Sequence, residues 1–343
     1  MRKLCLCFLV LLLGIMNATV VSAKPVPRDI SYILGLYYGE GSRFLIREND
    51  GNLELLYNYD SESRDFSHSN TFPLKKEHFD SYTINEAGPV LSAEEAVRFE
   101  RNAQGQGITC SIGGKRFSRF FYPGQNNNAF RFPAAANYDA LVKEAAAAVE
   151  PANLQQGQAV QLVNLLTTVP QVKLDLRYAS ANNCFGKPLY PVAKAYAGAN
   201  VAAALTKVAH SLAQDGYGLL IWEAYRPWSA SKLAYDLLPA ANKNMLASPA
   251  QGDIHNTGLA VDVSLYDLKT GASLTMISDY DEISPRQYSK FPGGTTEQRY
   301  LRDYLQHVMH QNGFTTSAME WWHFTLGAGT GFSRLNQPLT SLS

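Results

Sequence analysis

The sequence predicts a small antiparallel β-barrel or sandwich followed by an α+β domain. A length of 343 residues favours two domains over one. Residues 29–123 hold short, evenly spaced, strand-like runs separated by turn residues, a pattern typical of a small barrel. After about residue 160, helical spacing and strand-like runs alternate. The composition, 46% hydrophobic and 17% charged, is that of a globular chain rather than a disordered one.

The charge balance excludes one class of partner. The chain carries 30 Lys plus Arg and 30 Asp plus Glu, so its formal net charge is zero. A neutral chain without a basic block argues against a nucleic-acid partner. No apolar run reaches the roughly 18–20 residues that cross a bilayer, so we expect no membrane span in the mature chain.

The first segment, residues 1–23, has the pattern of a signal peptide. Arg2 and Lys3 form a short positive start, residues 4–16 are an apolar run of 13 residues, and small residues stand at the −3 and −1 positions before Lys24. A membrane anchor is the alternative, but the run is too short to span a bilayer. We therefore predict cleavage before Lys24 and export to a periplasmic or extracellular location.

Two of the four cysteines, Cys110 and Cys184, remain after this cleavage. An exported protein can hold a disulfide, but two cysteines in so long a chain are not a disulfide framework. We expect two separate thiols. Neither has the sequence neighbours of a catalytic thiol.

The strands of the first domain are expected from short runs of alternating or β-branched residues. Turn residues separate these runs, notably at 49–52 and 113–114. His68 and His78 lie in polar stretches and are expected to be solvated loop residues. The runs are Tyr32–Leu34, Arg43–Arg47, Leu53–Tyr57, Val97–Glu100, Ile108–Ile112 and Lys115–Arg119.

A joint connects the two domains. Residues 124–159 begin with a glycine and three asparagines, continue through alanine-rich stretches and end in a glutamine-rich stretch. This composition predicts one helix near Tyr138–Glu150 within a connector.

The second domain, residues 160–343, mixes helices and strands. Apolar residues at helical spacing predict helices over 201–212 and 301–309, and Gly residues follow each of them. Residues 217–224 read as a strand. Residues 261–265 alternate between apolar and polar, which predicts a strand with Asp262 on its polar face.

The histidines fall into two groups. His210, His307 and His310 lie on the predicted helices, opposite the apolar stripe, and a solvated helix face explains them better than a metal pair. The other two lie in unusual contexts: His255 precedes a glycine turn and the strand that carries Asp262, and His323 follows Glu-Trp-Trp.

Two imidazoles and one carboxylate make a three-ligand zinc site with a fourth position left for water. His255, Asp262 and His323 supply this set. Glu320 is held near His323 by the chain, where a general base for the attacking water belongs. A regular strand would turn positions 320 and 323 to opposite faces, so we expect a bend there.

A third polar motif ends in Arg226, which follows a predicted strand and precedes Pro227. A fixed guanidinium there would stabilise a tetrahedral oxyanion or hold a substrate carboxylate. The alternative is an ordinary arginine at a strand end, paired with an acid.

These motifs resemble the D-alanyl-D-alanine dipeptidases, zinc peptidases of the vancomycin-resistance type that are related to the D,D-carboxypeptidases and the Hedgehog fold. The resemblance covers about residues 160–326. It is carried by four blocks: Asp175-Leu176-Arg177-Tyr178-Ala179 with the following Asn182, Asn183, Gly186, Lys187 and Pro188; Tyr225-Arg226-Pro227; His255-x-x-Gly258-x-Ala260-x-Asp262; and Glu320-Trp321-Trp322-His323.

The resemblance implies roles for individual residues. His255, Asp262 and His323 become the ligands of one Zn²⁺ per chain, and Glu320 becomes the catalytic base. Arg226 becomes the arginine that stabilises the transition state.

The resemblance also implies a site for the substrate's free ammonium. Asp281 falls where the dipeptidases hold that group. Asp253 stands where the family has Ser, and we expect it to meet the same positive charge. Cys184 departs from the residue usual in its block.

The resulting hypothesis is a zinc peptidase that hydrolyses D-alanyl-D-alanine in cell-wall peptide metabolism. The alternatives are a D,D-carboxypeptidase that trims longer peptidoglycan stems and a non-catalytic cell-wall binding protein. A free-ammonium site at Asp281 favours the dipeptidase, and Glu320 argues against a pure binder, which needs no base. Every predicted catalytic group lies in residues 160–343, so we expect the barrel to be dispensable for the chemistry.

Overall fold

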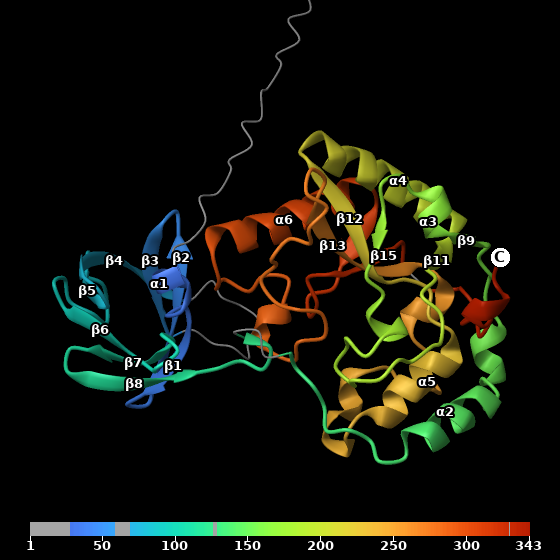
Figure 1. The fold of residues 1–343 in the computed structure, drawn as a ribbon, viewed down its shortest axis with the longest axis horizontal. Coiled ribbons are helices and arrows are strands. Elements are labelled where there is room, and N and C mark those ends of the chain that lie inside the picture. The colour runs from blue at the N-terminus through green and yellow to red at the C-terminus, as the bar shows by residue number, and fades with distance from the viewer. Residues whose placement is uncertain (1–27, 59–68, 126–128, 329) are drawn as a thin grey trace, which may run out of the picture.

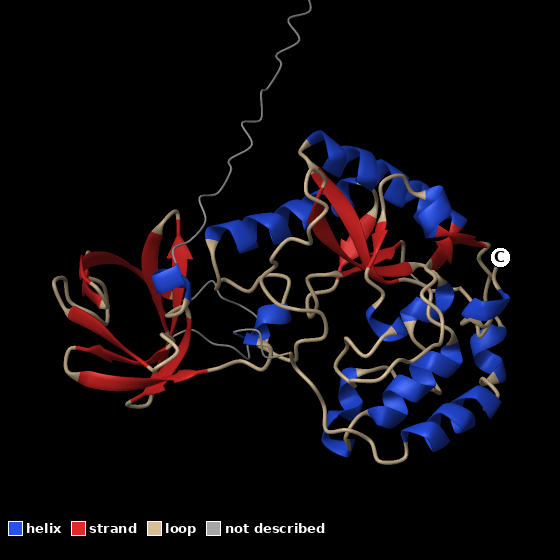
Figure 2. Cartoon of the chain, in the orientation of Figure 1, coloured by secondary structure: helices blue, strands red, loops and turns tan. Residues whose placement is uncertain are grey.

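The structure, a computed structural model, describes residues 28–58, 69–125, 129–328 and 330–343. The predicted signal peptide and His68 lie outside these residues. Figures 1 and 2 show a β-rich part joined to a larger part in which helices surround a sheet. Among the described helices, none is both long enough and apolar enough to cross a membrane.

The first part is a closed antiparallel barrel in which each strand pairs with the next and β8 pairs with β1. A short helix, α1 (Arg28–Ser31), precedes it. The strands are β1 (Gly35–Gly39), β2 (Ser42–Asn49), β3 (Asn52–Tyr57), β4 (Asn70–His78), β5 (Ser81–Ile84), β6 (Ala96–Arg101), β7 (Gly107–Ile112) and β8 (Lys115–Phe120). This closure confirms the barrel that the sequence predicts.

Local chemistry explains the barrel's first tight turn. Asp50 and Gly51 have φ angles of 49° and 85°, the left-handed pair that a two-residue hairpin between β2 and β3 requires. The predicted strand at Tyr32–Leu34 is wrong. These residues form a turn, closed by a bond from Ile33 N to Ile30 O, and β1 begins at Gly35. His78 is exposed, as expected, but ends β4 instead of lying in a loop.

The second part is built on a five-stranded sheet of order β10-β12-β13-β15-β14. β10 is parallel to β12, and the other neighbours are antiparallel. The strands are β10 (Lys173–Leu174), β12 (Tyr217–Glu223), β13 (Ala260–Asp267), β14 (Phe314–Thr316) and β15 (His323–Leu326). A separate pair joins β9 (Leu162–Asn164) to β11 (Tyr196–Gly198).

The helices α4 (Ala199–Gln214) and α6 (Thr296–Gln311) contact the sheet and each other, and α3 (Leu165–Thr168) lies against α4. They match the two helices that the sequence predicts. The strand β13 also appears where expected, but nearly all of its side chains are buried, including Asp262 on the predicted polar face. That face is covered because it carries the candidate site described below.

The joint is more ordered than a connector. The predicted helix is α2 (Tyr138–Ala147), and it packs against α5 (Trp228–Leu237) (Figure 1). The Tyr138 hydroxyl donates to the backbone oxygen of Pro188 at 2.6 Å. The joint therefore belongs to the surface of the second part.

The outer face of the barrel docks on the second part through both apolar and charged groups. Leu36, Leu45 and Leu56 of the barrel belong to the hydrophobic cluster of the second part. The buried Glu48 carboxylate accepts a bond from Thr296 N at 2.7 Å, at the start of α6. A carboxylate is favoured there because the first N–H groups of a helix are unpaired.

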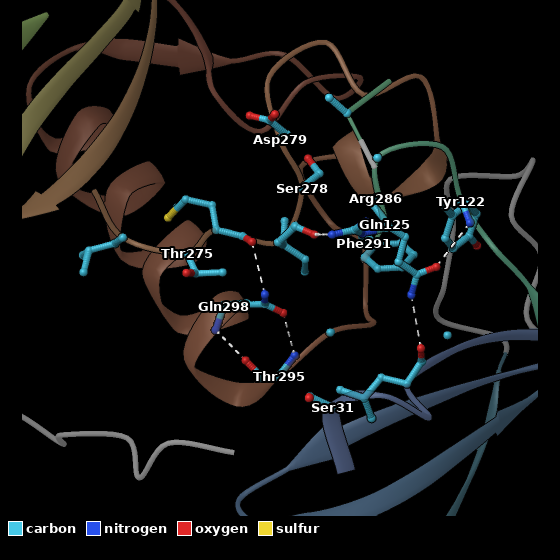
Figure 3. Close-up of a pocket in the computed structure, with 18 of the residues that line it drawn as sticks. Ser31, Tyr122, Gln125, Thr275, Ser278, Asp279, Arg286, Phe291, Thr295 and Gln298 are labelled. Atoms are coloured by element: carbon cyan, nitrogen blue, oxygen red, sulfur yellow. Dashed lines mark hydrogen bonds between the residues drawn. The ribbon is translucent and has the colours of Figure 1, made fainter. Parts of the chain in front are cut away.

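A cavity of about 600 Å³, which we call the junction cavity, lies where the two parts meet (Figure 3). Gln125 bridges its barrel side by donating to Leu34 O at 3.2 Å. Gln298 of α6 closes another side by donating to Met276 O at 3.2 Å. Asp279 also lines the cavity. None of the candidate metal ligands lines it, so the junction cavity is separate from the site described next.

Candidate metal centre and active site

The strand pairing brings two of the candidate ligands together. Asp262 of β13 and His323 of β15 are direct partners in the sheet register. His255 lies in a short 3₁₀ turn (Ile254–Thr257) that precedes β13. Gly258 ends this turn with φ 74°, a left-handed conformation that suits glycine, and so redirects the chain into β13.

The three ligand atoms converge. His255 Nε2 lies 3.2 Å from His323 Nδ1, and His323 Nδ1 lies 2.9 Å from Asp262 Oδ1. His255 Nε2 is 3.4 Å from Asp262 Oδ2. Among the described residues, these three form the group of His, Cys, Asp or Glu that could hold a metal ion.

The donor set fits zinc. Zinc bonds of about 2.0–2.1 Å in a tetrahedral site place two ligand atoms about 3.3 Å apart, close to the spacing found here. His255 Nδ1 donates to Ala224 O at 2.8 Å, which leaves the lone pair of Nε2 directed at the other ligands. The Tyr280 hydroxyl donates to Asp262 Oδ2 at 2.9 Å and so orients the carboxylate.

The electrostatics of this group favour a bound cation. Burial alone would lower the pKa of His255, but the Asp262 carboxylate raises it to about 9. Burial alone would raise the pKa of Asp262, but the two imidazoles hold it well below its usual range. The Asp262 carboxylate is thus a buried anion that favours positive charge beside it, carried by protons on the imidazoles or, in their place, by a bound cation.

Glu320 lies beside the three residues without joining them. Its Oε2 is 4.0 Å from His323 Nδ1, and its side chain is 37% exposed. Loss of hydration, together with the Asp262 and Asp281 carboxylates, raises the pKa of Glu320 to about 7, although His323 opposes this. A carboxyl group with such a pKa can both accept and release a proton near neutral pH.

The bend expected between Glu320 and His323 is present. His323 N donates to Glu320 O at 3.3 Å, which closes a turn, and β15 starts only at His323. Trp321 and Trp322 within the turn are fully buried and anchor it.

Arg226 is buried and tied to the turn that carries His255. Its Nη1 donates to Asp253 Oδ2 at 3.0 Å, and its Nε is 3.6 Å from Glu223 Oε2. Its backbone N donates to His255 O at 3.2 Å. Its charge opposes the rise in the pKa of both His255 and Asp281, so it acts on the metal centre and on the neighbouring pocket. The arginine is therefore ion-paired, and it is also held next to the site.

Both carboxylate oxygens of Asp253 accept hydrogen bonds from other residues of this chain. Its Oδ1 accepts from His255 N at 2.8 Å and its Oδ2 accepts from Arg226. Asp253 N also donates to the Asn256 side chain at 2.7 Å, which completes a capping box for the 3₁₀ turn. These bonds make Asp253 the residue that positions Arg226 and His255, so an additional contact with a substrate ammonium stays a prediction.

Asp281 lines a different cavity, of about 520 Å³, which we call the substrate pocket. Its Oδ2 accepts a bond from the Tyr178 hydroxyl at 2.5 Å, and the Cys184 thiol lies 3.6 Å away. Burial raises its pKa to about 6. Glu320 lines the same pocket, so the pocket opens beside the metal centre.

The remaining sequence candidates lie elsewhere. His210, His307 and His310 are exposed on α4 and α6, as predicted. Cys110 and Cys184 are free and buried, in the barrel core and beside the substrate pocket respectively.

Sequence reasoning gave no role to Tyr178 and Tyr280, whose hydroxyls orient Asp281 and Asp262. Tyr178 belongs to a block that resembles the dipeptidases, and Tyr280 is adjacent to Asp281. The position of each tyrosine in or beside a candidate site motif is the sequence signal that could have identified it.

Residues 158–341 match the family model described as D-ala-D-ala dipeptidase, and this segment is more than half of the chain. The chain belongs to this family. The D-Ala-D-Ala dipeptidases are zinc metallopeptidases, so this protein is a peptidase whose second part carries the family's domain.

Curated relatives agree with this assignment. The D-alanyl-D-alanine dipeptidase of Escherichia coli (strain K12) is 29% identical over 175 residues, which are 51% of this chain and 89% of that protein. The D-alanyl-D-alanine dipeptidase of Enterococcus faecium is 31% identical over 176 residues, which are 45% of this chain and 86% of that protein.

Among solved structures, the LdcB LD-carboxypeptidase is 18% identical, with a TM-score of 0.30, over 53% of this chain and 71% of that chain. A likeness of this size adds nothing to the family match.

We predict that the purified protein carries one zinc ion per chain and that His255→Ala, Asp262→Ala and His323→Ala each lose it. Removing one of three donors leaves too few protein ligands for a stable site. Metal content is measured by plasma mass spectrometry. His307→Ala, an exposed histidine on α6, and Glu320→Ala, which is beside the ligands, should both retain the metal. Full metal content in all three ligand variants would place the site elsewhere.

Proposed function

We propose that this peptidase hydrolyses D-alanyl-D-alanine in a zinc-dependent reaction outside the cytoplasm, as part of cell-wall peptide metabolism. The observation that carries the proposal is the convergence of His255, Asp262 and His323 beside an acidic pocket that holds Glu320 and Asp281. The family to which the chain belongs supports the same reaction.

His255, Asp262 and His323 would hold the zinc ion. When bound, zinc supplies a Lewis acid that polarises the scissile carbonyl and lowers the pKa of water. Ala224 O and the Tyr280 hydroxyl keep His255 and Asp262 in the orientation that this requires.

Glu320 moves the proton. Its carboxylate takes a proton from the attacking water as the new C–O bond forms. It then gives that proton to the amine nitrogen as the C–N bond breaks, so that the leaving group departs neutral. Its partial exposure and its pKa of about 7 support both steps.

Arg226 provides positive charge for the tetrahedral oxyanion. Its guanidinium is fixed by Asp253 and Glu223, and Tyr178 covers it with the ring centre 4.9 Å away. A charge that is already oriented needs no reorganisation during the reaction, which is the basis of oxyanion stabilisation.

Asp281 would bind the substrate's free ammonium. It is an acid in a pocket whose described lining residues include no lysine or arginine. This favours a dipeptide, which brings its ammonium close to the scissile bond. A longer peptidoglycan stem, the substrate of a D,D-carboxypeptidase, places an uncharged amide there. A non-catalytic binder would have no need for Glu320.

We predict that N-acetyl-D-Ala-D-Ala is a poor substrate, because acetylation removes the charge that Asp281 would bind. Asp281→Asn should lower kcat/KM for the free dipeptide about ten- to a hundredfold. The ratio of kcat/KM for the free dipeptide to kcat/KM for the acetylated one should therefore fall. Released alanine is measured for both substrates. Asp279→Asn is the matched control, since Asp279 faces Arg177 and the junction cavity, and it should leave both values nearly unchanged.

Equal hydrolysis of the two substrates by the wild-type enzyme would contradict the dipeptidase assignment. The D,D-carboxypeptidase would then take its place, with the same metal ligands and the same base.

The proposed location rests on the sequence of residues 1–23, which lie outside the described residues. We predict that the mature protein begins near Lys24 and is recovered outside the cytoplasm. N-terminal sequencing of the native protein, together with fractionation of the cells, measures both. A native protein that retains residues 1–23 would refute cleavage.

A further inference from the structure

One wall of the substrate pocket comes from outside the family's domain. The family match begins at residue 158, but Phe132, in the joint, lines this pocket together with Cys184, Asp281 and Glu320. Phe132 is only 9% exposed. The joint therefore contributes to the site and does not only connect it to the barrel.

Backbone and ring contacts fix Phe132 in place. Its backbone N donates to Cys184 O at 2.8 Å. Its ring stacks on Phe185, with ring centres 5.8 Å apart and an interplanar angle of 29°. Phe130 packs edge-on against Phe132, with ring centres 4.9 Å apart. These contacts make Phe132 a firm wall of the pocket.

Phe132 is linked to the candidate ammonium site through one residue. Cys184 accepts the backbone bond from Phe132, and its thiol lies 3.6 Å from Asp281 Oδ2. A dipeptide whose ammonium meets Asp281 carries its first side chain on the adjacent carbon. That side chain is then within reach of the wall that Phe132 and Phe185 form.

The charge, polarity and volume of the pocket indicate which substrate side chain fits it. Its acids are Asp281 and Glu320, and no lysine or arginine is found among its described lining residues. Most of the remaining lining is apolar and includes Phe132, Phe185, Leu238, Met245, Leu246 and Ile283. A volume of about 520 Å³ lies within the range of pockets that hold ligands much larger than an alanyl methyl group.

We propose that Phe132 is a specificity-determining residue that contacts the first side chain of the dipeptide, and that the enzyme accepts first residues that are apolar and larger than alanine. This inference rests on the proposed function. It assigns to the joint, outside the family's domain, a part in choosing the substrate.

The test compares kcat/KM for D-Leu-D-Ala with kcat/KM for D-Ala-D-Ala, each with a free ammonium, using the zinc-loaded full-length mature protein. The ratio of the two values does not depend on the fraction of folded enzyme, so lost stability alone cannot change it. We expect the wild-type enzyme to hydrolyse both dipeptides.

Phe132→Ala removes the apolar wall and should lower the ratio about tenfold, whereas D-Ala-D-Ala itself should change by less than about threefold. Phe132→Trp fills part of the pocket and should lower the ratio by a similar factor of about ten, because the larger side chain is excluded. Phe121→Ala is the matched control. It removes an aromatic ring that precedes the joint, is 39% exposed and does not line the pocket, so it should leave the ratio unchanged.

A lowered ratio in the Phe132 variants together with an unchanged ratio in Phe121→Ala supports the inference. If Phe132→Ala does not fold, the ratio measured for Phe132→Trp decides whether the inference holds. Hydrolysis of D-Ala-D-Ala with no hydrolysis of D-Leu-D-Ala by the wild type, or a ratio that Phe132 does not affect, would overturn the inference and leave the proposed function standing. Absence of hydrolysis of either dipeptide by the zinc-loaded wild type would overturn both.

Discussion

The pairing of Asp262 with His323 across β13 and β15 is the constraint on which the rest of the site depends. A slip of one residue in this register would turn Asp262 to the opposite face of the sheet and separate the ligands. Buried residues on either side hold the register. Val261 pairs with Phe324, and Val263 N donates to Trp322 O at 3.0 Å. The core thus fixes the geometry of the site before any ion binds.

A single loop connects the three regions around this pair. Asp279 faces the junction cavity and pairs with Arg177, Tyr280 orients Asp262, and Asp281 lines the substrate pocket. Consecutive residues therefore serve the barrel side, the metal centre and the substrate side. Asp281 has φ 52°, an uncommon backbone conformation that short polar residues tolerate, and this conformation helps to direct neighbouring side chains to different regions.

The sequence predicts α4, α6, β12 and β13 of the second domain because their signals are local. Apolar spacing locates α4 and α6, and alternation locates β13. The bend at Glu320 follows from the positions of two functional residues on one short segment. The barrel class is also predictable, but β4 and β5 are not, because β4 ends in exposed charged residues that lack an apolar pattern. The pairing of β8 with β1 closes the barrel, and this contact between distant strands is not visible in the local sequence pattern.

The contacts that sequence reasoning missed join distant parts of the chain. The bonds from Asp253 to Arg226 and from Tyr280 to Asp262 span 27 and 18 residues. The composition of residues 124–159 places Phe132 in a connector, and only the folded chain brings it to Cys184. Local periodicity carries no information about such contacts.

We propose that the imidazoles of His255 and His323 and the carboxylate of Asp262 form the metal site. Zinc-edge X-ray absorption on the purified mature protein tests this claim most directly. We expect a first shell of nitrogen and oxygen at about 2.0–2.1 Å, with the outer-shell scattering of two imidazoles. A sulfur shell at about 2.3 Å, or a shell without imidazole scattering, would contradict it.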